Sequence, residues 1–210
     1  MTEMSMNKAI HGAFRRDLSR FVGALSTFPP GDVKRGNQLA AAWANFDDQL
    51  TRHHTGEHEI AWPALMAVGT SPALLATMDA EHDSMAVAIA DVRAAMPALQ
   101  RTAGADDAAK ARAAFERLQT VTVAHLEHEE AEIEPIYLEK KDTAELKAMG
   151  RAFGKVGPAD GGRFFAWVTD GASPDEEAAI RRDVPGPVMA IIGGIFGSGY
   201  RKNIAPVWKS

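Results

Sequence analysis

Hydrophobic and polar residues alternate with the period of an α-helix through most of the first 140 residues of this chain. Apolar side chains recur at spacings of three and four, as in Phe14, Leu18 and Phe21, which places them on one helix face. The motifs FPPGD, GTSP and TAGADD interrupt the pattern, and Ser71 and Asp106 stand where N-caps are expected. The expected helices cover residues 4–28, 36–68, 72–101 and 106–140. Long helices with short connections predict an all-α fold, an antiparallel up-down four-helix bundle.

The pattern changes beyond the fourth predicted helix. Glycine and proline cluster in GKVGPADGG, DGASPDEE and VPGPVMAIIGGIFGSGY. The sequence therefore predicts a bundle over residues 1–142 and an irregular, short-helical C-terminal extension over residues 143–210, with a charged helix near 174–183. An apolar segment near 187–198 is expected to cover the bundle or a partner subunit, which makes a homodimer one expectation. A lipid surface is the less favoured alternative.

Composition and charge narrow the classes of partner. The chain of 210 residues has a net charge of −5, which argues against nucleic acid as the main partner. No apolar run is long enough to span a bilayer, and the first residues lack the order of a signal peptide. The chain has no cysteine, which excludes disulfides, thiolate zinc sites and iron–sulfur clusters. We expect a cytoplasmic protein without a membrane partner.

Histidine is confined to the predicted bundle. The seven histidines are His11, His53, His54, His58, His82, His125 and His128. His53 and Glu57 are four residues apart, as are His125 and Glu129, so each pair lies on one helix face. An imidazole and a carboxylate at this spacing can bind one cation, although a hydrogen-bonded surface pair has the same spacing.

A repeat favours the metal-binding interpretation. The pattern H-x3-E-x5-P occurs twice, and the other two histidines keep step with it: His11 precedes His53 by 42 residues and His82 precedes His125 by 43. The chain therefore consists of two helix pairs offset by 71–72 residues. In an antiparallel bundle this repeat places one histidine of each helix at a similar depth. The predicted metal ligands are His11, His53, Glu57, His82, His125 and Glu129.

The remaining histidines do not recur in the repeat. The aligned pairs are His54 with Leu126, His58 with Glu130, and Gly56 with His128. His54 also points about 100° away from His53 around the helix, so the three are interpreted as supporting or surface groups. A pairing of His54 with His58 remains an alternative. Glu81 and Glu127 are interpreted as solvated side chains rather than as supports for ligand imidazoles.

The donor set indicates which metals to expect. Six nitrogen and oxygen donors are too many for one tetrahedral zinc ion and suit two adjacent ions bridged by the carboxylates. An oxo or hydroxo bridge and an open position would complete the coordination. Imidazole and carboxylate ligands inside a bundle favour two iron ions, with manganese or zinc as alternatives. The open position would take water, a small diatomic molecule or peroxide.

These motifs resemble those of the hemerythrin-like, or HHE cation-binding, family. The resemblance rests on His11, HHTGE, EHD and HLEHE and covers roughly residues 5–140. It implies a four-helix bundle with a non-haem di-iron centre, in which the four repeat histidines are terminal ligands and Glu57 and Glu129 are bridging ligands. Oxygen-carrying hemerythrins have a fifth histidine one turn from the third-helix ligand, where this chain has Met78 and Ala86. The chain is more similar to the bacterial subgroup in which HxxxE occurs twice.

Three functional hypotheses follow from the sequence. The first is a di-iron protein that binds or senses a small oxidant (dioxygen, nitric oxide or peroxide), or iron itself. The second is a redox enzyme that decomposes hydrogen peroxide at the same site, as a catalase does. The third is a metal-free helical interaction domain whose histidines are structural.

Overall fold

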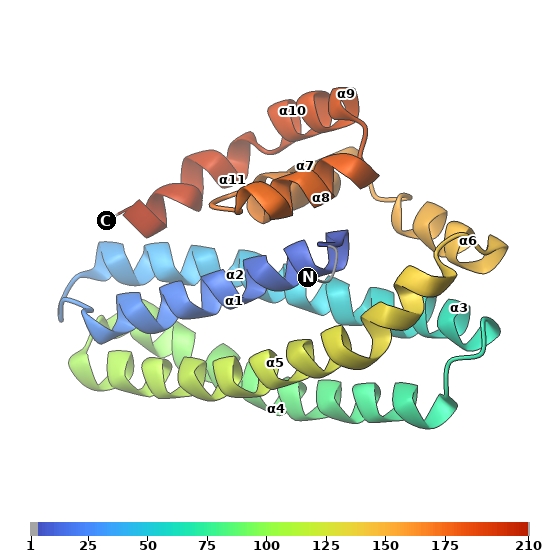
Figure 1. Ribbon diagram of the computed structural model, residues 1–210. Coiled ribbons are helices and arrows are strands. Elements are labelled where there is room, and N and C mark those ends of the chain that lie inside the picture. The colour runs from blue at the N-terminus through green and yellow to red at the C-terminus, as the bar shows by residue number, and fades with distance from the viewer. Residues whose placement is uncertain (1–3, 210) are drawn as a thin grey trace.

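Four long helices form the body of the protein, whose residues 4–209 are described by a computed structural model. They are α1 (Met6–Ser26), α2 (Val33–Gly56), α4 (Pro72–Thr102) and α5 (Ala105–Lys140). The chain continues from α2 through a π-helical turn, η1 (Glu57–Ala61), into α3 (Trp62–Ala67). Successive long helices run in opposite directions, with α5 beside both α4 and α1 (Figure 1). No strand occurs between residues 4 and 209, and the predicted all-α class is confirmed.

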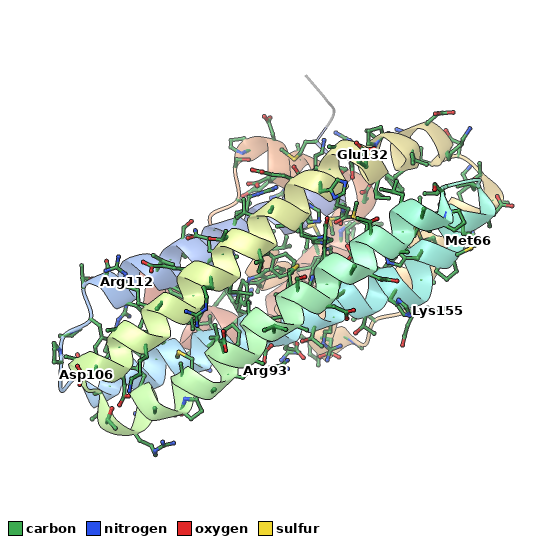
Figure 2. The ribbon with its side chains drawn as sticks, turned by 90° about the horizontal axis from the view of Figure 1, so that it is seen from below. Met66, Arg93, Asp106, Arg112, Glu132 and Lys155 are labelled. Carbon is green, nitrogen blue, oxygen red and sulfur yellow. The ribbon has the colours of Figure 1, made fainter. Side chains whose placement is uncertain are left out.

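One of the two predicted N-caps is wrong. Ser71 occupies the N-cap position of α4 as expected, without a capping hydrogen bond from its side chain, but α5 begins before Asp106, with Gly104 as its N-cap. The Thr102 hydroxyl donates to the Asp107 carboxylate at 2.6 Å and accepts from the Gly104 N–H at 3.0 Å. These two bonds close the turn that connects α4 to α5, and the helix begins at Ala105. Asp106 therefore lies in the first turn of the helix at the end of the bundle (Figure 2), where its negative charge interacts favourably with the positive end of the helix dipole.

Two apolar clusters fill the bundle, and a polar layer separates them. The larger cluster is rich in aromatic side chains, and Phe21 stacks on Phe115 with 4.3 Å between ring centroids. The smaller cluster consists of Ala61, Trp62, Leu65, Leu75, Met78, Ile133 and Leu146. On α4, His82 lies between Met78 of the smaller cluster and Met85 of the larger one. The candidate ligands thus occupy the boundary between two well-packed regions.

The outer faces of α4 and α5 are charged. Arg93, Arg112 and Glu132 point away from the bundle (Figure 2). Arg93 forms two hydrogen bonds of 2.8 Å with the carboxylate of Asp47, which ties α4 to α2. None of the helices that the structure describes has the length and apolar character needed to cross a bilayer.

The C-terminal extension contains more helix than the sequence predicts. Its main helices are α6 (Ala144–Phe153), α7 (Pro158–Val168), α8 (Pro174–Asp183) and α11 (Ser198–Asn203). Shorter elements are α9 (Gly186–Val188), η2 (Met189–Gly193), α10 (Gly194–Phe196) and the 3-10 turn η3 (Ala205–Lys209). Pro158 and Pro174 stand at helix N-termini, where the missing N–H of proline costs nothing. Pro158, which suggests irregular structure, therefore starts a helix here, and α8 matches the predicted charged helix.

The extension packs on the bundle along α1 and α2. Figure 1 shows α7, α8 and α11 on that side of the molecule. Trp167 of α7 is fully buried, and its ring lies 5.0 Å from that of Phe14 on α1. Its indole N–H donates to the Asp17 carboxylate at 2.8 Å. This side of the bundle is thus completed by the extension.

Candidate metal centre

The structure brings the six predicted ligands together inside the bundle. His11 comes from α1, His53 from α2 and His82 from α4, while His125 is provided by α5. Four donors in one group approach within 4.8 Å of one another: His11, His53, Glu57 and Glu129. A second group meets the same limit: His54, Glu57, His82 and His125. The two groups share Glu57, so they form one continuous centre.

Glu57 connects the groups through its two oxygens. Its Oε1 lies 2.9 Å from His53 Nε2, and its Oε2 lies 3.3 Å from His82 Nε2. Glu57 is the first residue of the π-helical turn η1 and is buried. Its position four residues after His53 provides the contact that the HxxxE spacing predicts.

Glu129 lies closer to one group than to the other. Its Oε2 is 3.2 Å from His11 Nε2 but 4.0 Å from His125 Nε2. Its Oε1 accepts a hydrogen bond of 3.0 Å from the Asn7 side-chain amide. The amide holds this carboxylate on the side of His11.

Outer carboxylates orient two of the imidazoles. His125 Nδ1 donates to Glu81 Oε2 at 2.8 Å, and His11 Nδ1 donates to Glu130 Oε1 at 2.9 Å. Because a carboxylate only accepts, each Nδ1 carries the proton, and a neutral ring then has its lone pair on Nε2. Both Nε2 atoms face the centre. The interpretation of Glu81 as a solvated side chain is therefore wrong. The sequence does not reveal this contact, because it depends on the packing of α4 against α5.

Several donor atoms of the centre are buried without a hydrogen bond. They are Nε2 of His11, His53 and His54, both carboxylate oxygens of Glu57, and Glu129 Oε2. Across the same space, His82 Nε2 and His125 Nε2 lie 3.0 Å apart. Unsatisfied buried polar atoms are costly, and natural structures contain few of them. Cations bound by these atoms would satisfy them, so the residues present fit a metal centre.

The electrostatics also suit cations. Burial lowers the pKa of His11, but Glu129 and Glu130 outweigh it and raise that pKa to about 9. Burial and the neighbouring His82 hold the pKa of His54 well below its usual value, so this ring is neutral. Burial opposes ionisation of Glu57, yet its histidine neighbours lower its pKa strongly. Neutral imidazoles and ionised carboxylates are the forms that bind metal, and binding would displace a proton from His11.

Of the three histidines predicted to lie outside the centre, His54 lies within it. Its ring is stacked on His82 with 4.1 Å between centroids, and one of its ring nitrogens is among the converging donors. His58 has 68% of its side chain exposed and pairs with Asp79, so the alternative pairing of His54 with His58 is wrong. His128 Nδ1 bonds to Glu81 at 2.7 Å outside the centre. The signal that could have found His54 is its position three residues before Glu57, which also places the two on one face.

The fold and the donor set define a helical-bundle protein with a histidine–carboxylate centre able to hold metal. A family model, the hemerythrin HHE cation-binding domain, matches residues 5–149. The chain belongs to this family. Comparison with curated proteins and with solved structures gives no significant match. Family and geometry together fit a metal-binding, hemerythrin-like protein.

Proposed function

We propose that this protein holds two iron ions in the centre and binds or senses a small oxidant there (dioxygen, nitric oxide or peroxide), or iron itself. The observation that supports the proposal is the pair of four-donor groups sharing Glu57. Two groups of this size exceed what a single tetrahedral ion requires. Imidazole and carboxylate donors without thiolate favour iron, with manganese and zinc as alternatives.

The protein residues around the donors create a suitable environment. Iron, when bound, supplies one-electron redox chemistry and an exchangeable coordination position. Glu57 and Glu129 contribute negative charge that offsets the charge of buried cations. Leu50, Met78 and Met85 are fully buried and belong to the two apolar clusters beside the centre. They limit access of water, which strengthens every electrostatic interaction at the site.

Metal analysis of protein purified from iron-supplemented cells tests the proposal. We expect two irons per chain and a charge-transfer absorption in the near-ultraviolet and visible range. His125→Ala should lose both the iron and the absorption, because it removes one of the converging donors. His125 Nε2 lies 3.0 Å from His82 Nε2. His58→Ala is the matched control, since its exposed side chain lies outside the centre.

The same samples distinguish the three hypotheses. A spectral change on exposure to dioxygen or nitric oxide, without turnover, supports a binder or sensor. Oxygen evolution from hydrogen peroxide that disappears with the metal in His125→Ala would instead favour peroxide decomposition. A protein that contains no iron, and whose thermal stability is unaffected by a chelator, would contradict the proposal and leave the helical interaction domain.

A further inference from the structure

We propose that His54 is a seventh metal ligand, which makes one half of the centre nitrogen-rich and the other half oxygen-rich. The nitrogen-rich subsite would comprise His54, His82, His125 and Glu57; the oxygen-rich subsite would comprise His11, His53, Glu57 and Glu129. This inference rests on the proposed metal-binding function and extends it.

Helix geometry explains how two consecutive histidines can serve one centre. On a helix that turns about 100° per residue, Glu57 lies about 40° round from His53 and about 60° round from His54. The carboxylate therefore projects between the two rings, one turn further along. Its Oε1 is close to His53 (2.9 Å to Nε2) and its Oε2 is close to His82 (3.3 Å to Nε2), the ring on which His54 stacks. His53 thus contacts one oxygen of Glu57, and His54 stacks on the histidine that contacts the other.

Glu129 leaves a coordination position that His54 fills. The Asn7 amide holds Glu129 Oε1 at 3.0 Å, and Glu129 Oε2 is 4.0 Å from His125 Nε2. The half of the centre formed by His82 and His125 is consequently short of a carboxylate oxygen. A ring nitrogen of His54 lies within 4.8 Å of the donor atoms of that half, and His54 Nε2 is buried without a hydrogen-bond partner.

The contacts of the His54 ring distinguish a ligand from a packing group. The ring stacks on His82 at an interplanar angle of 20° and meets the His125 ring edge-on at 88°. Packing alone would require only an apolar ring at this place. His54 instead places Nε2 in a buried position without a hydrogen-bond partner, beside three other donors. A bound cation accounts for the nitrogen, whereas packing does not.

Titration of the metal-free protein with Co(II) tests the proposal, because the visible spectrum of this ion reports its coordination. The decisive variant is His54→Phe, which retains a ring against His82 but removes the nitrogen. Loss of an outer hydrogen-bond partner typically lowers metal affinity about 10- to 100-fold. Loss of a ligand should therefore lower the affinity for one of the two Co(II) ions at least about 10-fold. Circular dichroism of the metal-free variant verifies that it folds. His58→Ala should titrate like the wild type.

The spectra also show which subsite has changed. His54→Phe should remove the same Co(II) bands as His82→Ala, while His11→Ala should remove a different set. If the wild type and His54→Phe bind Co(II) with equal stoichiometry, affinity and spectra, His54 is a packing residue and the inference is wrong. If the wild type itself binds no Co(II) and no iron, the proposed function fails as well, so the two failures are distinguishable.

Discussion

Glu81 joins two histidines of α5 to α4, and its replacement by alanine tests how the bundle orients the predicted metal ligand His125. Its carboxylate accepts from His125 Nδ1 at 2.8 Å and from His128 Nδ1 at 2.7 Å. In Glu81→Ala the His125 ring loses the acceptor that fixes its tautomer and orientation. Its Nε2 would then be presented to the metal in only part of the population.

The size of the effect follows from the type of contact. Removal of a carboxylate that supports a ligand imidazole typically lowers metal affinity about 10- to 100-fold, which corresponds to about 1.4–2.7 kcal/mol. The metal-free protein should lose about 1–3 kcal/mol of stability, because the substitution leaves the Nδ1–H of His125, whose side chain is 1% exposed, without its acceptor. Metal affinity and stability of Glu81→Ala are therefore measured separately.

Competition with a chromophoric chelator measures the affinity, and urea unfolding of the metal-free protein measures the stability. Glu127→Ala is the matched control, because Glu127 is an exposed glutamate between the same two histidines in sequence. His128→Ala should have a smaller effect than Glu81→Ala, since the contact of Glu81 with His125 remains. Equal metal affinity in Glu81→Ala and Glu127→Ala would refute the orienting role.

Three further predictions concern the extension, the pH dependence and the oligomeric state. Trp167→Ala removes a fully buried indole and leaves Asp17 without its donor, so the free energy of unfolding should fall by about 3–5 kcal/mol in urea titrations; a loss below about 1 kcal/mol would contradict the packing of the extension. Burial raises the pKa of Glu134, so ionisation of this carboxyl destabilises the fold as pH rises above its ordinary pKa of 4.5. Glu134→Gln should therefore be more stable than the wild type at neutral pH and equally stable below pH 4.5. A gain in stability that persists in acid would show that ionisation of Glu134 is not its cause. Ile191 and Ile195 are 59% and 62% exposed on the apolar segment; if they join two copies, sedimentation should show a dimer that Ile195→Asp converts to monomer, whereas a monomeric wild type excludes this interface.

The four-helix core was predictable because its signals are local. Apolar residues at helical spacing and the breaker motifs place the long helices within a few residues of their observed ends. The π-helical turn at Glu57–Ala61 has no such signal in the sequence, because it depends on how the chain passes from α2 into α3. The extension was underestimated because Pro158 is read as a breaker, whereas its position at the start of α7 depends on the neighbouring residues.

The centre was predictable where the repeat determines it and unpredictable elsewhere. The HxxxE spacing and the offset between helix pairs predict a set of side chains that the structure brings together. Contacts of Glu81 with His125 and of Glu130 with His11 join different helices, so they require the packing angle and rotation of those helices. His54 was excluded because its equivalent in the repeat is not a histidine. That reasoning assumes that the centre is symmetric.

The repeat relates one pair of contacts in the centre, but it fails at two positions beside them. His11 Nε2 lies 3.2 Å from Glu129 Oε2, and the repeat-related pair, His82 Nε2 and Glu57 Oε2, lies at 3.3 Å. The equivalent of Asn7, however, is Met78, which is fully buried and cannot donate a hydrogen bond, so Glu57 remains free to contact both halves while Glu129 is held on one side. The equivalent of His54 is Leu126, which is buried in the larger apolar cluster and offers no donor. The two departures are complementary, because the amide of Asn7 withdraws a carboxylate oxygen from the half of the centre to which His54 adds a nitrogen. On the proposed assignment, the two halves of the centre would therefore bind metal unlike each other, although both halves keep the repeated histidines and glutamates.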